Sequence, residues 1–361
     1  MWKSILFIST LFSLSYYFLL LKPSQNPSPL SFSLDFPYNQ LQYGNQRHYK
    51  LLGKLNKGKA GQVFLAQHLP SGDTVAFKLF TNTTESLFMA EIGICLKLHN
   101  APNMLLPRDI LRQVGRGNSV QYGIVFDYFE AEHYRTLFPA LTKLQIKHFI
   151  YQTLKTLNYA HNLGIMHRDI KPLNVLMNKE AQEIRVIDWG SSDYYISNKR
   201  KSVRVASLNF KAPELLLGYE FYDYAVDIWS TGCLLAEMVF LKIHFFQGEI
   251  LRHVEEENSL MEQLEAIVRI KGLRELREYA EKYQKEMNME MLMKLAGIYE
   301  ERAFESFINE ENRHLVDDNA LDLLDKMLEY DHSKRITAAE ALKHPYFDEV
   351  REGIRKQDTS L

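Results

Sequence analysis

A short stretch in the middle of the chain contains side chains of the types that phosphoryl transfer requires. Asp169, Lys171 and Asn174 lie close together, and Asp188 follows one short strand and one turn later. Transfer of a phosphoryl group needs a carboxylate beside the attacking hydroxyl, hard oxygen ligands for Mg²⁺ and a cation that offsets the phosphate charge. The two aspartates, the asparagine and the lysine supply these groups. The set therefore predicts phosphoryl-transfer chemistry, although a histidine or aspartate of such a loop, taken alone, is more often structural.

A second pair of charged residues lies earlier in the chain. Period-two alternation places Lys78 on the same strand face as Ala76 and Phe80. Glu91 falls on the apolar stripe of a predicted helix, where an unpaired carboxylate would be costly. We therefore expect Lys78 to be the partner of Glu91, although either residue alone would be interpreted as a surface charge. The other members of that stripe are Leu87, Ile94, Cys95 and Leu98.

A glycine-containing turn precedes this pair, with Asn56, Gly58 and Gly61 in the segment 56–61. Two glycines allow such a turn to bring backbone N–H groups close to phosphates. A plain hairpin has the same pattern, so the turn alone does not decide between a phosphate site and a simple connection.

The elements that position these residues follow from apolar periodicity and turn signals. A turn cluster at 69–73 joins two strands, and an amphipathic helix ends at Gly164. The predicted elements are strands over 62–67 and 74–80, helices over 85–98 and 143–163, and strands over 175–177 and 184–187.

Together these motifs resemble the signature of the eukaryotic protein kinases. Asp169, Lys171 and Asn174 follow His167 and Arg168 in the pattern H-R-D-x-K-x-x-N; D-W-G at 188–190 and A-P-E at 212–214 come next. Val-Ala-Phe-Lys at 75–78 and Glu91 stand upstream in the expected order. The resemblance implies an α+β fold with two lobes: a small β-rich N-lobe with one main helix and a larger, mostly helical C-lobe.

The resemblance also implies a role for each matching residue. Lys78 is implied to hold the α- and β-phosphates of ATP and Glu91 to orient it, while Asp169 accepts the proton of the substrate hydroxyl and Lys171 stabilises the γ-phosphate. Asn174 and Asp188 are the implied Mg²⁺ ligands. The implied nucleotide-binding residues are Asn56, Gly58, Gly61, Val63, Ala76, Lys78, Leu176, Phe126, Asp127 and Tyr128, the last three forming the hinge. The implied structural residues are His167, Asp227, Trp229 and the ion pair Glu214–Arg335.

Among kinases, the chain is most similar to the casein kinase II catalytic subunit. Five segments carry the similarity, namely 43–46, 164–169, 187–190, 203–207 and 330–332, and the resemblance extends from about 35 to about 347. Trp189 in the D-W-G motif is especially telling. Lys171 followed by Pro172 resembles serine/threonine kinases, and GTP is an alternative phosphoryl donor to ATP.

Casein kinase II favours serine or threonine with acidic residues downstream. A group of cations in one segment fits acidic or phosphorylated substrates, although a solvated charged loop explains the group equally well. Two departures argue against the acidic preference: Leu208 replaces an arginine of the family, and the segment 81–85 lacks its lysine-rich cluster. The expected substrate-binding cations are Lys199, Arg200, Lys201, Arg204 and Lys211.

Regulation is also implied by the resemblance. The segment 35–46 aligns with the family segment that packs on the activation loop, which favours constitutive activity. The family's regulatory β-type subunit docks on the N-lobe near the loop at 111–119. This loop is about three residues longer than in the family, so the sequence leaves open whether such a subunit binds. Asn56 replaces the first glycine of the phosphate turn but can also adopt positive φ. The alternative is a catalytically weak pseudokinase acting as a membrane-tethered scaffold, which the complete catalytic set disfavours.

Composition places the chain among ordinary globular proteins. Apolar residues make up 46% and charged residues 24%, and 43 basic against 45 acidic residues give a net charge of −2. This balance excludes a globally basic nucleic-acid binder, so no nucleic-acid partner is expected. The two cysteines exclude a disulfide-rich scaffold or a four-cysteine zinc site.

The N-terminus differs from the rest of the chain. The apolar run at 5–21 corresponds to about 26 Å of helix, just short of the roughly 30 Å hydrocarbon core. The absence of a small-x-small cleavage site favours an uncleaved anchor over a cleaved signal, and a mistaken start codon is a third reading. Free cysteines favour a kinase domain facing the cytosol, whereas the sequon at Asn82 favours the secretory lumen or secretion.

The expected domain organisation is an anchor or signal at 1–22, a spacer and packing segment at 23–48, a kinase domain at 49–347 and a tail at 348–361. Within the kinase domain we expect the N-lobe at 49–126, the hinge at 127–130 and the C-lobe at 131–347.

Overall fold

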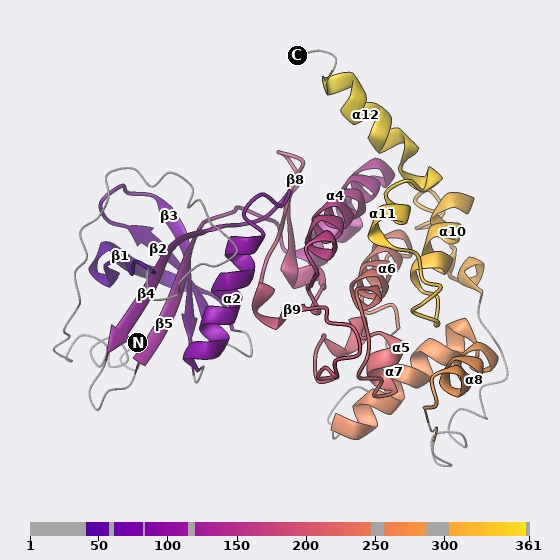
Figure 1. Cartoon of the computed structure of the whole chain (residues 1–361). Helices are drawn as coiled ribbons and strands as arrows, with labels where there is room; N and C mark the ends of the chain where they lie inside the picture. The colour runs from indigo at the N-terminus through magenta and orange to yellow at the C-terminus, as the bar shows by residue number, and fades with distance from the viewer. Residues whose placement is uncertain are drawn as a thin grey trace, which may run out of the picture. The chain divides into compact units, whose positions relative to one another are not determined.

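The computed structural model describes residues 41–57, 61–81, 84–114, 120–246, 256–285, 287 and 303–358. The chain divides into two compact units, one comprising 1–100 with 105–129 and the other 101–104 with 130–361 (Figure 1). Within the described ranges, no helix is both long enough and apolar enough to cross a bilayer. The predicted anchor at 1–22, the spacer residues 23–40 and Gly58 lie outside the described residues.

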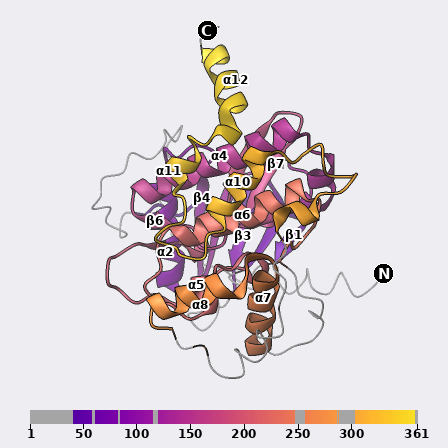
Figure 2. The ribbon, with the colours of Figure 1, turned by 90° about the vertical axis from the view of Figure 1, so that its right-hand side faces the viewer.

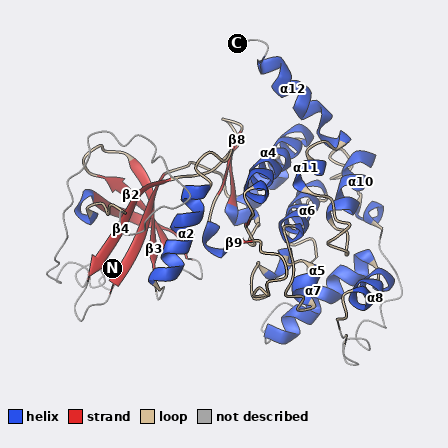
Figure 3. Ribbon diagram, in the orientation of Figure 1, coloured by secondary structure: helices blue, strands red, loops and turns tan. Residues whose placement is uncertain are grey.

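The first unit is built on a five-stranded sheet in which every neighbouring pair is antiparallel. The strand order is β1-β2-β3-β5-β4, and Figure 3 shows the strands of this unit in red. The strands are β1 (Tyr49–Lys57), β2 (Gly61–His68), β3 (Thr74–Phe80), β4 (Pro107–Val114) and β5 (Val120–Asp127), and the described part of the unit has one long helix, α2 (Glu85–Lys97).

Alternation along the strands gives this sheet two apolar faces. On one face, Phe80 and Ile124 pack with Phe88 and Ile92 of α2. On the other face, Val75 and Phe77 pack with residues of β2, β4 and β5. The helix prediction over 85–98 is confirmed, but its stripe is wrong at Leu87, which is 62% exposed. The buried face begins one residue later, at Phe88, so that Glu91 remains buried.

The residues that precede β1 pack on the same sheet. Leu41 belongs to the cluster that contains Phe80 and Phe88. The Gly44 N–H donates to the Ile110 carbonyl at 2.8 Å, and a Cβ on Gly44 would lie 1.8 Å from the Asp109 carboxylate. A side chain at this position would therefore require the Asp109 carboxylate to move. These contacts, made by part of the segment predicted to pack on the activation loop, connect it to the sheet of the first unit.

The second unit is mostly helical (Figure 2). Its centre is α6 (Ala225–Val239), in which every residue is buried and which contacts helices on several sides. Its other helices are α3 (Tyr134–Leu137), α4 (Lys143–Asn162), α5 (Pro213–Leu216), α7 (Glu256–Lys271), α8 (Leu273–Lys282), α10 (Asp318–Met327), α11 (Ala338–Ala341) and α12 (Asp348–Asp358). A five-stranded sheet with one long helix, followed by a mainly helical unit, confirms the predicted α+β organisation.

Two small antiparallel ribbons in the second unit carry the predicted chemical residues. They pair β6 (Ile165–Met166) with β9 (Asp193–Tyr194), and β7 (Val175–Asn178) with β8 (Glu183–Val186). The helix before them, α4, begins with a capping box of Thr142 and Gln145 and is followed by Gly164 at φ 77°. A glycine in this left-handed conformation ends a helix without strain, as the sequence predicts.

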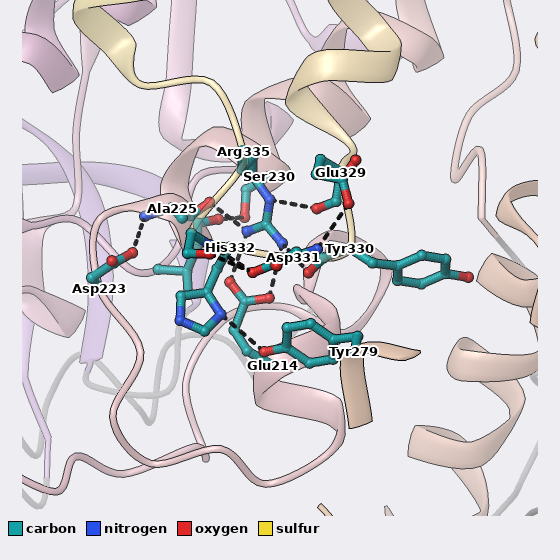
Figure 4. A network of polar contacts seen from close by, with 12 residues as sticks. Glu214, Asp223, Ala225, Ser230, Tyr279, Glu329, Tyr330, Asp331, His332 and Arg335 are labelled. Carbon is teal, nitrogen blue, oxygen red and sulfur yellow. Dashed lines mark hydrogen bonds and ion pairs between the residues drawn. The ribbon is translucent and has the colours of Figure 1, made fainter. Parts of the chain in front are cut away.

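A buried ion pair joins distant segments of the second unit. Arg335 donates two hydrogen bonds to the carboxylate of Glu214, at 2.7 and 3.0 Å, and both side chains are fully buried (Figure 4). The guanidinium also donates to the carbonyls of Ala225, Glu329 and Tyr330. This network fixes the start of α6 against the loop before α11, and it confirms the predicted pairing.

Candidate active site

The first unit contributes a buried ion pair. Lys78 Nζ lies 2.7 Å from Glu91 Oε1, with side chains 10% and 3% exposed. Lys78 lies on the central strand β3, opposite Val63 of β2 and Ile124 of β5. Strand pairing on both sides holds the lysine, and the helix brings the carboxylate to it. The predicted pairing of these two residues is confirmed.

The predicted nucleotide-binding residues of this unit fall into two groups. Val63, Ala76 and Phe126 share the sheet face of Lys78, because Val63 is opposite Lys78 and Ala76 is opposite Phe126. Asp127 and Tyr128 follow at the exposed end of β5, where the Asp127 carboxylate accepts a hydrogen bond from Arg108 at 3.0 Å. The structure therefore places the first three residues on the same sheet face as Lys78.

Two described residues of the predicted phosphate turn, Asn56 and Gly61, lie in strands. Asn56 is an exposed residue of β1, opposite Val63, and it does not use the left-handed conformation that the sequence permits. A Cβ on Gly61 would lie 2.1 Å from the Leu79 carbonyl oxygen. The close approach of β2 to β3 therefore requires a glycine at position 61, independently of any phosphate binding.

In the second unit, the Asp169 carboxylate is held by four hydrogen bonds. Oδ2 accepts from Lys171 Nζ at 2.6 Å and from Asn174 Nδ2 at 3.1 Å. Oδ1 accepts from the backbone N–H of Ser207 at 3.1 Å and from its hydroxyl at 2.9 Å. Lys171 also donates to the Ser207 hydroxyl oxygen at 3.1 Å. The arrangement fixes the direction of the carboxylate and places an ammonium group directly beside it.

The loop that carries Asp169 is anchored to α6. The buried carboxylate of Asp227 accepts the N–H groups of His167 and Arg168 at 2.8 and 2.7 Å, and His161 Nε2 lies 2.9 Å from it. Burial alone would raise the pKa of Asp227, but its bonds to His161 and the His167 amide outweigh burial and hold this pKa below its usual value. These bonds stabilise Arg168 at φ 66°, immediately before Asp169.

His167 has a packing role. Its ring is buried, Nδ1 accepts the N–H of Asp169 at 3.2 Å, and Nε2 lies 3.1 Å from the carbonyl of Ile187. Burial lowers the pKa of His167, which favours the neutral ring that this bonding pattern needs. The ring also lies 4.5 Å from that of Trp189. His167 therefore links the loop of Asp169 to the segment of Asp188.

Asn174 and Asp188 come together because β7 and β8 pair. Val175 is opposite Val186, and the N–H of Ile187 donates to the carbonyl of Asn174 at 2.9 Å. Both hydrogen bonds of the Asn174 side chain use its NH₂ group, so the oxygen Oδ1 has no hydrogen-bond donor among the described residues. An amide oxygen beside a carboxylate is a donor set that suits Mg²⁺. The residues present therefore fit the metal.

The order of these residues along the chain is matched by a known family. The family model described as protein kinase domain matches residues 49–347. The chain belongs to the protein kinase family. Protein kinases use ATP with a divalent metal, typically Mg²⁺, and they phosphorylate protein substrates. The five-stranded unit is the N-lobe of this kinase and the helical unit is its C-lobe.

The segment that follows Asp188 in this kinase is held by Arg168. The guanidinium donates to the carbonyl of Ser191 at 2.7 Å, to the carboxylate of Asp193 at 3.1 Å and to the hydroxyl of Tyr222 at 3.0 Å. Tyr222 in turn donates to the carbonyl of Ser202 at 2.7 Å. Arg168 thus connects the two ends of the segment 191–202 through partners from the chain itself.

The predicted substrate cations divide into exposed and buried residues. Lys199, Arg200 and Arg204 are exposed. Lys201, also predicted to bind substrate, is buried: its ammonium donates to the carbonyls of Ile196, Lys199 and Tyr222, and burial lowers its pKa. Lys211 is buried as well and donates to the carbonyls of Val203 and Val205, at 2.9 and 2.6 Å. Backbone carbonyls of an irregular segment need donors, and these two lysines supply them.

Sequence reasoning missed Ser207 as a member of the site. The segment 203–207 contributes to the family resemblance, but it gives no role to the serine side chain. Ser207 is 38 positions from Asp169 in the sequence, and an isolated serine has no periodic signal. Its position between the D-W-G and A-P-E motifs is the one feature that could have identified it.

Proposed function

We propose that this kinase phosphorylates serine and threonine in acidic sequence contexts, in the manner of casein kinase II. The observation that carries the proposal is the set of donors around Asp169: Lys171, Asn174 and Ser207 all bond to one carboxylate. Lys171 followed by Pro172 is the serine/threonine pattern, and its bonds to both Asp169 and Ser207 give that lysine a fixed place beside the base.

In the proposed reaction, the oxygen of the substrate hydroxyl attacks the γ-phosphorus of ATP, and Asp169 accepts the hydroxyl proton. The bond from the γ-phosphorus to the bridging oxygen breaks, and ADP leaves. Ser207 and Asn174 hold the carboxylate in position, and Lys171 offsets negative charge that develops on the phosphoryl group. Glu91 orients Lys78, which is assigned to the α- and β-phosphates. Asn174 and Asp188 would hold Mg²⁺, which neutralises phosphate charge when bound. Val63, Ala76 and Leu176 are assigned to the adenine.

Activity without phosphorylation of the activation segment is supported by Arg168. Phosphorylation orders the activation loops of kinases by forming new pairs between arginine and phosphate. Here the guanidinium of Arg168 already bonds to Asp193, Tyr222 and the carbonyl of Ser191. We therefore expect the segment to be ordered as synthesised, and the kinase to be constitutively active.

The acidic preference rests on the three exposed cations. Lys199, Arg200 and Arg204 leave their charges at the surface of the segment that follows Asp188, although Arg200 lies 3.5 Å from Glu220. Acidic residues of a substrate are complementary to this charge. Because Lys201 and Lys211 serve the backbone, the proposal assigns the preference to three residues and not to five.

We also propose that residues 1–22 anchor the kinase in a membrane with its catalytic domain in the cytosol. The apolar run at 5–21 supports the anchor, and the free cysteines support the cytosolic side. Use of GTP and binding of a regulatory β-type subunit belong to the same resemblance. They are tested by competition with GTP and by measuring the mass of the assembly.

The test uses the full chain, purified in mild detergent, with peptides that differ in the acceptor (serine, threonine or tyrosine) and in acidic or neutral flanks. We expect the highest kcat/KM for serine or threonine in acidic flanks, without prior phosphorylation. Asp169→Asn should lower kcat by about 10²- to 10⁴-fold, the usual contribution of a general base. Equal rates with neutral flanks would refute the acidic preference. No turnover by the folded wild type would instead support the scaffold alternative.

A further inference from the structure

The C-lobe has a continuous group of aromatic rings that the phosphotransfer reaction does not use. Tyr219 lies 6.0 Å from Phe221, 5.1 Å from Tyr283 and 5.2 Å from His332, measured between ring centroids. Tyr283 and His332 are 4.5 Å apart. We call these four residues the aromatic strip. They come from the loop after α5, the end of α8 and the loop before α11, and Phe221 is 39% exposed.

Three cations lie over the rings of the aromatic strip. The guanidinium of Arg200 is 6.0 Å from the ring of Phe221, Lys285 Nζ is 5.8 Å from Tyr219 and Lys282 Nζ is 5.0 Å from Tyr283. Lys282 Nζ donates a hydrogen bond to the carboxylate of Asp331 at 2.6 Å. Arg200 has only an exposed contact with Glu220 at 3.5 Å, and such pairs contribute little. Lys285 donates to the carbonyl of Gly218 at 2.7 Å and is not in an ion pair with any described residue.

Hydrogen bonds to buried or partly buried neighbours fix two side chains of the aromatic strip. Tyr283 donates to the carboxylate of Asp331 at 2.7 Å, and Tyr279 lies 3.0 Å from His332 Nδ1 (Figure 4). The same loop continues into Arg335 and the buried pair with Glu214. Side chains that are fixed before binding lose little conformational entropy when a partner arrives. Aromatic residues with a polar edge are also the types enriched in protein interfaces.

The aromatic strip is directly connected to the segment that carries the proposed substrate cations. The N–H of Lys201 donates to the carbonyl of Glu220 at 2.9 Å, and its ammonium donates to the carbonyl of Tyr222 at 3.2 Å. Arg200 connects the two surfaces: it is one of the proposed substrate cations, next to Lys199, and its guanidinium lies over the ring of Phe221. A polypeptide lying along Lys199 and Arg200 would therefore meet the strip next.

We propose that the aromatic strip is a second docking surface for protein substrates, and that it binds an acidic stretch distant from the phosphorylated residue. The proposal rests on the proposed function, because it extends the acidic preference beyond the immediate flanks. Charge complementarity selects this occupant: carboxylates suit Arg200 and Lys285, and apolar or aromatic groups suit Phe221 and Tyr219. A second copy of the chain would bring the same cations against one another.

The test compares three peptides with the same acceptor site: a short one, a long one that carries a distal block of Asp and Glu, and a long one in which that block is Asn and Gln. The block is placed on either side of the acceptor. Kinetics are measured on the full chain with Phe221→Ala and Lys285→Gln, neither of which is in the catalytic set. Leu144→Ala and Lys326→Gln are matched controls, since Leu144 is 46% exposed and Lys326 forms an exposed pair with Asp322.

For the wild type, we expect a lower KM for the acidic long peptide than for the other two. Each strip variant should raise that KM about fivefold, the effect of losing one moderate interface contact. KM for the short peptide, kcat and the melting temperature should not change. Equal KM values for the acidic and amide long peptides, or a rise of KM on all three, would overturn the docking surface. So would a dimer in sedimentation that Phe221→Ala dissociates. Failure of the proposed function is distinguishable, because the short peptide would then be phosphorylated equally well with acidic and with neutral residues beside its acceptor, or not at all.

Discussion

Removal of the Ser207 hydroxyl tests how the catalytic carboxylate is positioned. Ser207→Ala deletes the bond to Asp169 Oδ1 at 2.9 Å and the bond from Lys171 at 3.1 Å, and it keeps the backbone bond at 3.1 Å. A hydrogen bond to a charged group contributes about 1.5–3 kcal/mol. Since about 1.4 kcal/mol corresponds to a factor of ten in rate, we expect kcat to fall roughly 10- to 100-fold. KM for ATP should remain within about twofold of the wild-type value, because the lost bonds concern the carboxylate.

The assay is steady-state phosphorylation of an acidic serine peptide, with thermal denaturation as a check on folding. Ser207→Thr keeps a hydroxyl at the same position and should recover most of kcat. Ser202→Ala is the matched control, because Ser202 lies in the same segment and its hydroxyl accepts only the N–H of Arg204 among the described residues. A wild-type kcat for Ser207→Ala, or an equal loss in Ser207→Thr, would refute positioning by the hydroxyl.

Three further predictions concern buried charges. Glu91→Gln should raise KM for ATP about tenfold without unfolding the N-lobe, because Lys78 loses a charged partner at 2.7 Å; an unchanged KM in ATP titrations would contradict this. Glu214→Gln leaves Arg335 buried without its charge partner and should lower the free energy of unfolding in urea by about 3–5 kcal/mol; a loss below about 1 kcal/mol would count against it. Burial raises the pKa of Glu237 from 4.5 to about 7, so the folded state holds a proton that the unfolded state releases, and stability falls as the pH rises through this interval. Glu237→Gln should therefore be up to about 3 kcal/mol more stable than the wild type in urea titrations at pH 8 and nearly equal to it at pH 5, whereas parallel pH profiles would disprove the assignment.

The sequence predicts the strands and helices whose apolar residues recur at a regular spacing, and the helix end that is marked by a glycine. The strands at 62–67 and 74–80 are found within β2 and β3, and the helix at 143–163 is α4 with its glycine stop. Pairing of Lys78 with Glu91 was also predictable, because an apolar stripe cannot bury a lone carboxylate. In each case a short-range pattern contains the physical reason for the structure.

The parts that could not be predicted depend on long-range contacts in irregular chain. Lys201 and Lys211 have the composition of a solvated charged loop, yet both are buried because carbonyl groups of the same segment need donors. Nothing in the local sequence distinguishes them from Lys199, which is exposed. Leu87 illustrates the same limit on a smaller scale, because a helical stripe is defined only to within one residue.

Left-handed backbone at three non-glycine residues explains why Lys211, one of the predicted substrate cations, has a different role. Arg168, Asp188 and Ala206 have φ of 66°, 62° and 64°, and each lies at or beside Asp169, the metal residues or Ser207. Such conformations cost roughly 1–2 kcal/mol each, so neighbouring groups must hold them. Asp227 does so for Arg168 through two backbone N–H groups. Lys211 does so for Ala206, because its ammonium binds the carbonyl of Val205 at 2.6 Å and thereby sets the turn that presents Ser207 to Asp169. Lys211, which the sequence predicts to be a substrate contact, therefore acts through the backbone on Asp169, the proposed base.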